Sequence, residues 1–324
     1  MSISAKIVGV GSYIPEKVVD NHMLESIVDT SDEWIVKRTG ISERRVIIEE
    51  NNTMMAVAAA KQAMDHAGVS ADEIGIIVGS TVTSDYATPS LASLVQKGIG
   101  CENAAALDVA AGCTGFIYAL TAITSMMDTL DIDTGLVIAA ENLSCRVDWT
   151  DRSNCILFGD GAGAVVVKRS KENHIKFPFL KAIPDTEDVL YIKNKRNDNP
   201  WSKNQASDDI SLVMKGQEVF VFAVDAMEKA INYLEAAMGD TKIDKIVPHQ
   251  ANNRIIQFAA HSTNFEKDQF YVNVDKYANT SSATIPIALK EAHDSGWLKK
   301  GDEVALIGFG AGLTYGGIVV KWAI

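Results

Sequence analysis

Cysteine is scarce in this chain, and its spacing excludes the common cysteine-based frameworks. Four cysteines stand among 324 residues, at positions 101, 113, 145 and 155. No two of them have the Cys-x-x-Cys spacing of a zinc or redox motif, and they are too sparse for the disulfide framework of a small secreted domain. We therefore expect reduced thiols in a reducing compartment and no structural metal site.

Long apolar runs and excess basic charge are also absent. No stretch of about 18 apolar residues occurs, so we expect no membrane-spanning helix. The first residues lead into a strand pattern without the layout of a secretion signal, which favours a cytoplasmic protein. Lys and Arg number 30 against 42 Asp and Glu, a net charge of −12. This balance argues against a general nucleic-acid-binding protein, because phosphate contacts need Lys and Arg.

The chain does contain a regular alternation of apolar runs and longer amphipathic segments. Its 324 residues exceed a typical domain of about 100 to 150 residues, which predicts two packed halves. We expect strands over residues 5–10, 74–80, 104–109, 134–140, 163–168, 245–248, 271–274, 303–308 and 316–322. We expect helices over residues 53–67, 90–99, 114–127, 218–238, 252–260 and 284–295. This pattern indicates an α/β fold in which helices cover parallel strands.

Residues 108–120 place Cys113 where a strand pattern gives way to a helical one. The unpaired N–H groups and the dipole of a helix start favour the thiolate, which is the nucleophilic form of cysteine. Gly112 and Gly115 leave room on either side for a substrate to approach. We therefore predict an activated thiol. Taken alone, Cys113 also fits a small buried cysteine at a strand-helix junction.

Two segments of the second half carry candidate partners for this thiol. His249 follows the strand pattern of residues 245–248 and precedes a helical run. Asn279 lies near the start of another helix, among small residues that leave its amide free to face a cavity. Taken alone, the histidine also fits a helix cap or a buried core residue, and the asparagine fits an N-cap.

Further motifs stand in a specific order along nearly the whole chain. They lie at residues 30–45, 149–152, 157–164 and 308–316. Together with Cys113, His249 and Asn279 they resemble the type III ketoacyl-acyl-carrier-protein synthases, within the thiolase-like condensing enzymes. The resemblance implies that these three residues form a catalytic triad. It also implies an αβαβα sandwich of two similar βα halves, with the nucleophile in residues 1–170 and the other two residues in 171–324.

The chemistry implied by the resemblance is a decarboxylative condensation in two steps. Cys113 takes the acyl group of an acyl-CoA and releases CoA, while backbone N–H groups of Cys113 and of Gly310 or Ala311 hold the oxyanion. Malonyl-carrier protein then loses CO₂, and His249 and Asn279 donate hydrogen bonds to the resulting enolate oxygen. The carbanion attacks the acylated cysteine and gives a 3-oxoacyl-carrier protein. We expect acyl-CoA as a substrate and no tightly bound cofactor.

The resemblance also implies a CoA site, formed by Thr30, Trp34, Arg38 and Arg152. An indole and a guanidinium can sandwich the adenine, and arginine also suits phosphate. The alternative makes Trp34 a core aromatic residue and pairs Arg152 with Asp151 or Asp160.

For the acyl group, the resemblance indicates a pocket lined by Phe309 and by Thr88 from the partner of a homodimer. Thr88 stands where a phenylalanine is usual. Since a smaller side chain enlarges the pocket, we expect primers longer or more branched than acetyl. Ala278 and Ala311 stand where glycine is usual, but we expect catalysis to survive, because an alanine at 311 keeps the backbone N–H.

An acyl carrier protein is acidic, so it must dock on a locally basic patch of this acidic chain. Arg254, next to the His249 motif, is the main candidate. Other candidates are Lys37, Arg38, Arg44, Arg45 and Lys215. Val221 and the helix at residues 255–263 lack basic side chains that family members often carry, so we expect weaker or differently organised docking.

Two polar segments have structural interpretations. Residues 159–163 carry three glycines, which suggests phosphate binding, but their place between two apolar runs favours a tight turn between strands. Residues 193–209 carry no apolar periodicity, which predicts a loop over the active-site side or, alternatively, a disordered insert.

Three other functions remain open from the sequence. A non-catalytic acyl- or CoA-binding module needs Trp34 and Arg152 but not the triad. A cysteine hydrolase shares the triad and releases free acid without a malonyl donor. A thiolase-superfamily enzyme of specialised metabolism, making ketones or quinolones, has the same triad and differs only in its product.

Overall fold

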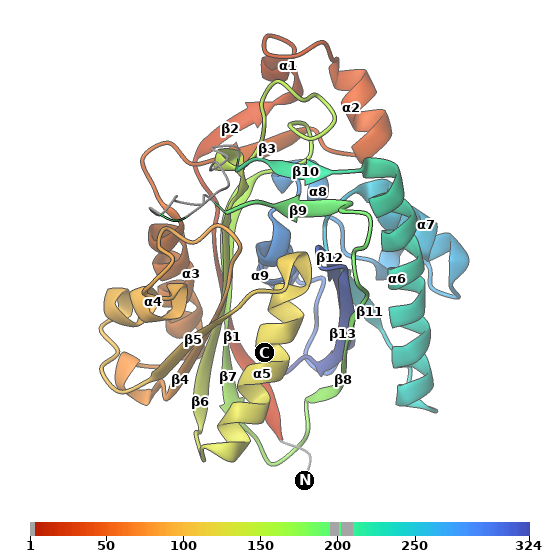
Figure 1. The fold of residues 1–324 in the computed structure, drawn as a ribbon. Coiled ribbons are helices and arrows are strands. Elements are labelled where there is room, and N and C mark those ends of the chain that lie inside the picture. The colour runs from red at the N-terminus through yellow and green to blue at the C-terminus, as the bar shows by residue number, and fades with distance from the viewer. Residues whose placement is uncertain (1–3, 195–200, 202–209) are drawn as a thin grey trace.

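The computed structural model describes residues 4–194, 201 and 210–324, and two β-sheets dominate it (Figure 1). The first sheet contains, in spatial order, β1 (Ala5–Tyr13), β7 (Asp160–Arg169), β6 (Thr134–Asn142), β4 (Ile76–Ser80) and β5 (Ala105–Val109). Strands β5, β4 and β6 are mutually parallel, whereas β7 and β1 continue the sheet in antiparallel pairs.

The second sheet repeats part of this pairing pattern. It contains, in spatial order, β11 (Lys245–Pro248), β12 (Glu303–Gly310), β13 (Thr314–Lys321) and β8 (Ile175–Ala182). One parallel pair is followed by two antiparallel pairs, and the same succession joins β4, β6, β7 and β1 in the first sheet. The topology agrees with two similar halves, while the boundary between residues 170 and 171 stays a prediction.

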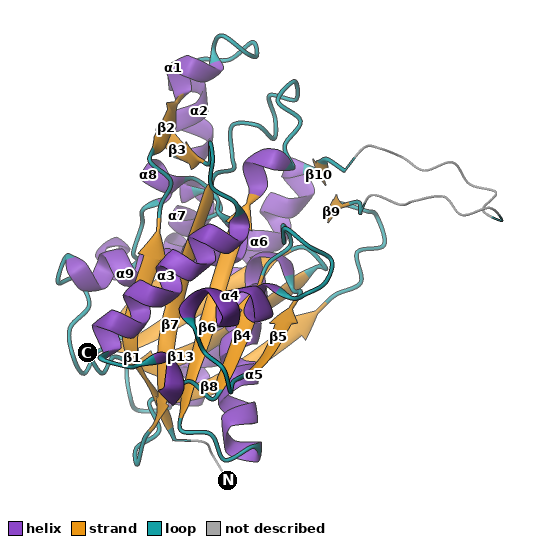
Figure 2. Ribbon diagram, turned by 90° about the vertical axis from the view of Figure 1, so that its left-hand side faces the viewer, coloured by secondary structure: helices purple, strands orange, loops and turns teal. Residues whose placement is uncertain are grey.

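Helices lie between the sheets and on both outer faces (Figures 1 and 2). The central pair is α5 (Gly115–Thr129) and α9 (Thr284–Asp294), and the outer helices are α3 (Asn52–Ala67), α4 (Leu91–Ile99), α6 (Gly216–Met238) and α7 (Asn253–Ser262). Helix α5 buries apolar side chains such as Phe116, Leu120 and Ile123 completely, as a helix enclosed by two sheets must. This is the α/β layered sandwich that the resemblance implies.

Most of the long predicted elements are confirmed, but the strand predicted over residues 271–274 is wrong. Only one parallel bridge forms there, between Ile246 and Phe270. The side chain of Gln250 takes the backbone groups that a strand would need, donating to Tyr271 O at 3.0 Å and accepting from Asn273 N at 3.0 Å. The chain then turns into the short helix α8 (Val274–Tyr277).

The turn predicted over residues 159–163 is also wrong, because most of this segment belongs to β7. The strand begins at Asp160 and pairs on both sides, so that Gly163 lies between Ser12 of β1 and Ala139 of β6. A Cβ atom on Gly163 would lie 2.7 Å from the Cβ of Pro286 in α9. The glycine therefore permits close packing of the central helix against the sheet.

Several short elements have too little periodicity to be predicted from the sequence. They are β2 (Lys17–Asp20), α1 (Asn21–Leu24), α2 (Asp32–Thr39), β3 (Glu43–Val46), β9 (Leu190–Ile192) and β10 (Leu212–Met214). Strands β9 and β10 form an antiparallel pair at the base of the predicted polar loop. Residues 195–200 and 202–209 of that loop lie outside the described residues. Within the described ranges, no helix is both long enough and apolar enough to span a membrane.

Candidate active site

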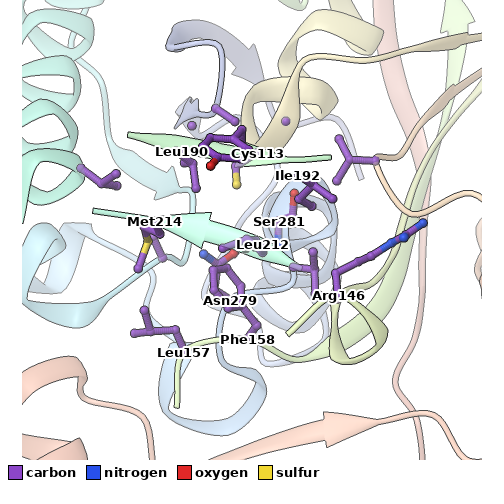
Figure 3. A pocket seen from close by; sticks show the side chains of 18 of the residues that line it. Cys113, Arg146, Leu157, Phe158, Leu190, Ile192, Leu212, Met214, Asn279 and Ser281 are labelled. Carbon is purple, nitrogen blue, oxygen red and sulfur yellow. Dashed lines mark hydrogen bonds between the residues drawn. The ribbon is translucent and has the colours of Figure 1, made fainter. Parts of the chain in front are cut away.

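A cavity of about 1350 Å³ brings residues of both halves together. This volume exceeds the usual range of about 300 to 1,000 Å³ for small-molecule pockets, which suits a long ligand. Cys113, His249 and Asn279 all line the cavity, as do Trp34 and Arg38. Figure 3 shows the Cys113 sulfur and the Asn279 amide pointing into it. Its apolar wall includes Val82, Leu143, Ile156, Leu157, Phe158, Leu190, Ile192, Leu212, Met214 and Phe309.

Cys113 lies in a single 3₁₀ turn, η2 (Gly112–Thr114), between β5 and α5. Gly112 has a φ of 52°, a left-handed conformation that suits glycine. The end of β12 lies against the nucleophile, because a Cβ atom on Gly310 would be 2.9 Å from Cys113 N. The Thr114 hydroxyl lies 3.0 Å from the Thr314 hydroxyl. Both halves of the chain therefore hold the nucleophile in place.

Cys113 lies just before the α-helix, and the predicted activation of its thiol by the helix start stays a prediction. Burial raises the pKa of Cys113 to about 12, and the Ser281 hydroxyl lowers it only in part. The α-helix itself begins two residues later, at Gly115. Burial and the backbone N–H groups therefore act on the pKa of this thiol in opposite directions.

His249 projects from the end of β11 and is 1% exposed. Its backbone N–H donates to Ile307 O at 2.8 Å, and its ring packs edge-on against Phe309 with 5.0 Å between centroids. Burial lowers the pKa of His249 to about 3, so the ring is neutral near neutral pH. Nδ1 lies 2.6 Å from the Thr284 hydroxyl oxygen. Nε2 is therefore the ring nitrogen left to meet a substrate.

The backbone of Asn279 is fixed on both sides. Its N–H donates to Leu157 O at 2.9 Å, and its C=O accepts from Gly159 N at 3.1 Å. Its side-chain oxygen accepts a 2.8 Å bond from Ser281 N. Because the oxygen is engaged, the amide NH₂ remains available as a donor. The N-cap residue of α9 is Ala283, so Asn279 is not the cap of that helix.

Three further polar residues of the site were missed in the sequence. Thr284 hydrogen-bonds His249, Ser281 lines the cavity together with Cys113, and Glu141 lies fully buried near the end of β6. A carboxyl group that ends an otherwise apolar strand was a usable signal for Glu141. Thr284 and Ser281 are common residue types near a helix start and gave no signal of their own.

Three of the side chains predicted to bind CoA cluster around the indole of Trp34, which lies on helix α2. The guanidinium carbon of Arg38 lies 4.5 Å from the Trp34 ring centroid, and that of Arg152 lies 5.1 Å away. Arg152 donates to Asp29 O at 2.8 Å and lies 3.7 Å from the Asp29 carboxylate. The alternative pairing of Arg152 with Asp151 or Asp160 is therefore wrong.

Thr30 lies near this cluster in sequence but does not line the cavity, and its buried hydroxyl has no hydrogen-bond partner among the described residues. Gly310 and Ala311 do line the cavity beside Cys113. Thr88 is exposed and is not among the lining residues. Its predicted contribution from a partner subunit stays a prediction.

The basic candidates for carrier docking fall into different environments. Arg254 is exposed beside the cavity, with its guanidinium carbon 5.4 Å from the Phe220 ring centroid. Arg44 is wrong as a docking residue because it is fully buried and bonds Ile156 O and Asn21. Within the described part of the chain, no group of three or more His, Cys, Asp or Glu side chains can hold a metal ion.

The layered fold and the shared Cys, His and Asn cavity define a thiolase-like α/β protein. Two family models match the chain: "3-Oxoacyl-[acyl-carrier-protein (ACP)] synthase III" at residues 107–182 and its C-terminal counterpart at residues 234–322. The beta-ketoacyl-[acyl-carrier-protein] synthase III of Clostridium acetobutylicum is 43% identical over 98% of this chain and 99% of the relative. The chain therefore belongs to the 3-oxoacyl-acyl-carrier-protein synthase III family.

Solved structures agree with this family. The crystal structure of 3-oxoacyl-[acyl-carrier-protein] synthase III from Aquifex aeolicus VF5 is 41% identical and matches with a TM-score of 0.91, covering 98% of this chain and 100% of that one. The priming beta-ketosynthase from the R1128 polyketide biosynthetic pathway is 33% identical and matches with a TM-score of 0.92, covering 99% and 97% of the two chains.

Proposed function

We propose that this chain is an acyltransferase that condenses an acyl-CoA primer with malonyl-acyl-carrier protein. The products are a 3-oxoacyl-carrier protein, CO₂ and CoA, and the reaction starts fatty acid synthesis. The observation that carries the proposal is the cavity that joins Cys113, His249 and Asn279 with the Trp34 cluster. Family membership supports the same assignment.

In the first step, the Cys113 sulfur attacks the thioester carbonyl of acyl-CoA, and the CoA thiolate leaves. Negative charge on the carbonyl oxygen is held by the backbone N–H of Cys113 and one from Gly310 or Ala311, next to which the cysteine packs. Trp34, Arg38 and Arg152 bind the CoA nucleotide by stacking and by charge. No tightly bound cofactor takes part.

In the second step, malonyl-carrier protein loses CO₂ and the enolate charge falls on the thioester oxygen. The neutral His249 ring and the free NH₂ of Asn279 donate to this oxygen. For Nε2 to carry the ring proton, Nδ1 must accept the Thr284 hydroxyl proton. The carbanion then attacks the acyl carbonyl on Cys113 and releases the product.

The active form is a homodimer in the cytoplasm. Strand β5 is an edge strand of the first sheet, and its exposed and half-buried residues are mostly apolar, so a second copy can pair with it. Tyr86, near Thr88 in the loop before α4, is 57% exposed. Thr88 from the second copy closes the acyl pocket beside Phe309, and its small side chain admits long or branched primers.

Arg254 receives the acidic carrier protein.

The experiment is mass spectrometry of the products from a panel of acyl-CoA primers, each offered with malonyl-carrier protein or with malonyl-CoA. We expect 3-oxoacyl-carrier protein with carrier-bound donor only, at higher rates for primers longer or more branched than acetyl. Strict acetyl preference would contradict the enlarged pocket. Free fatty acid without condensation would identify a hydrolase, and no turnover would identify a binding module.

The second candidate is a priming enzyme of specialised metabolism. It is favoured by the similarity to the priming ketosynthase of the R1128 polyketide pathway. The same product panel decides between the two, because such an enzyme uses a different malonyl donor or releases a ketone or quinolone product.

A further inference from the structure

The oxyanion hole of the proposed mechanism is divided between two distant segments of the chain. One N–H group belongs to Cys113 in η2, and the other belongs to Gly310 or Ala311, where β12 ends. Groups that stabilise a transition state must stay within about 0.5 Å of their productive positions. The fold therefore needs a device that fixes these two segments relative to each other.

Close packing brings the two segments together. A Cβ atom on Gly310 would lie 2.9 Å from Cys113 N. A Cβ atom on Gly112 would lie 3.2 Å from Ala311 N. Packing between such small residues limits how far the segments can separate, but it is not directional. The orientation of the N–H groups requires hydrogen bonds, which depend on angle as well as distance.

The side chain of Thr314, at the start of β13, supplies such bonds to both segments. Its hydroxyl lies 3.2 Å from Ala111 O, just before η2, and 2.9 Å from Ala311 O. Ala111 O also accepts from Thr114 N at 3.1 Å and so closes the turn that contains Cys113. One hydroxyl group therefore contacts a carbonyl group on each side of the oxyanion hole.

A second hydroxyl group completes this network. Thr114 Oγ1 lies 3.0 Å from Thr314 Oγ1 and 3.2 Å from Thr314 O. A hydroxyl has one proton to donate, so when Thr114 donates to Thr314 Oγ1, the Thr314 proton remains for the two alanine carbonyls. Thr114 is fully buried and Thr314 is 9% exposed, so water competes little for these bonds.

We propose that Thr314 is a positioning residue of the oxyanion hole. This inference rests on the proposed function. Because peptide units are planar, a bond to Ala111 O or Ala311 O limits the rotation of the adjoining peptide units, which carry the N–H groups of Cys113 and Ala311. The Thr314 hydroxyl thereby holds both donors toward one point, where the oxygen of the acyl carbonyl lies.

The proposal separates the steps of the reaction. The acyl carbonyl oxygen becomes negatively charged when Cys113 is acylated and again when the carbanion attacks the acyl-cysteine, so both steps use this oxyanion hole. Malonyl decarboxylation places its charge on another oxygen, which His249 and Asn279 hold. Loss of the Thr314 hydroxyl is therefore expected to slow acylation and condensation and to spare decarboxylation.

The test variant is Thr314→Val, which keeps the branched shape and removes the hydroxyl. We expect the maximal single-turnover rate of Cys113 acylation to fall about 10- to 100-fold, less than when an oxyanion donor is deleted outright. The acyl-CoA concentration for half-maximal rate and the rate of malonyl decarboxylation are expected to change less than about threefold. Thr314→Ala removes the same hydroxyl without the branch and is expected to divide the steps in the same way.

Thr114→Val is the matched control. It removes an equally buried hydroxyl and the same 3.0 Å contact, but it leaves Thr314 able to donate to Ala111 O and Ala311 O. Denaturant melts are expected to show similar losses of stability in the two valine variants, while acylation falls less than about threefold in Thr114→Val. Thr314→Ser keeps the hydroxyl and is expected to acylate at nearly the parent rate.

Three results would overturn the role of Thr314. They are parent-like acylation in Thr314→Val and Thr314→Ala, equal losses of acylation in the two valine variants, and a parallel loss of malonyl decarboxylation in Thr314→Val. The last two would show that the hydroxyl pair supports the fold and does not orient the oxyanion donors. If the parent chain itself forms no acyl-cysteine, the proposed function fails, and the inference that rests on it fails with it.

Discussion

At the scale of single residues, the site combines three groups that depend on their neighbours for reactivity. Burial raises the pKa of Cys113 and lowers the pKa of His249, since it disfavours the charged form of each. The Thr284 hydroxyl then decides which nitrogen of His249 carries the ring proton.

Thr284 sets the tautomer of His249. Its hydroxyl lies 2.6 Å from Nδ1 and 3.1 Å from Ser281 O, so it can donate to either. Donation to Nδ1 leaves the ring proton on Nε2, where a substrate oxygen needs it.

We predict that Thr284→Val slows malonyl decarboxylation by about 10- to 100-fold, the effect of one lost buried hydrogen bond. Acylation of Cys113 is expected to change less than threefold, because Nε2 does not act in that step. Thr284→Ser keeps the hydroxyl and serves as the matched control. Parent-like decarboxylation in the valine variant would show that Thr284 does not orient the ring.

Ala278 stands in a conformation that favours glycine. Its φ is 56° and its ψ is −158°, and the residue is 1% exposed next to Asn279. We predict that Ala278→Gly raises the free energy of unfolding by about 1 kcal/mol, because the backbone strain is removed. Denaturant melts measure this. The control Ala283→Gly, at an ordinary φ of −78°, is expected to lower the free energy of unfolding. A lower free energy of unfolding in both variants would contradict the backbone strain at Ala278.

At the scale of elements, long periodic segments were predicted well and short ones were not. Helices such as α3 and α6 and strands such as β6 follow from periodicity, because burial on one face or on both fixes their pattern. The strand predicted over residues 271–274 failed because the single side chain of Gln250 captured its backbone groups. The turn at residues 159–163 failed because glycine there serves packing against α9.

The residues of the site divide in the same way, into those that local sequence motifs predict and those that only the folded structure brings together. Cys113, His249 and Asn279 were found through the motifs around them, and the structure places all three on one cavity. The activation of Cys113 stays a prediction, because burial in the folded molecule, which the segment alone does not reveal, raises the pKa of its thiol. Ser282 and Glu141 are 141 residues apart in sequence, and only folding brings them into hydrogen-bond contact.

Helix α2 carries the predicted nucleotide contact of the site. We predict that Trp34→Ala raises KM for acyl-CoA by about tenfold, which corresponds to the loss of one cation–π platform of roughly 1 to 2 kcal/mol. Acyl-pantetheine, which lacks the nucleotide, is expected to react equally well with both proteins. Trp34→Phe retains an aromatic face and is the control. A parallel loss with acyl-pantetheine would place Trp34 in the core instead.

At the scale of the whole molecule, the nucleophile belongs to one half and its partners to the other. The end of β12 packs against Cys113, and the Thr114 and Thr314 hydroxyls join the halves at this point. The proposed acyl pocket would extend this arrangement to a second copy of the chain, which we propose contributes Thr88.

We predict that Thr88→Phe shifts primer preference toward acetyl-CoA by tenfold or more, since an aromatic ring shortens the pocket. The measurement is the ratio of condensation rates for acetyl-CoA and a long or branched acyl-CoA. Thr88→Ser is the control and is expected to keep the parent ratio. An unchanged ratio in the phenylalanine variant would remove Thr88 from the pocket.

The central claim is that Cys113 carries the acyl group between the two steps. Intact-mass spectrometry of the chain after mixing with acyl-CoA tests it directly. The account predicts one acyl adduct, located on Cys113 by peptide mapping, absent in Cys113→Ala, and discharged into 3-oxoacyl-carrier protein when malonyl-carrier protein is added. An adduct on another residue, or condensation at the parent rate in Cys113→Ala, would contradict it.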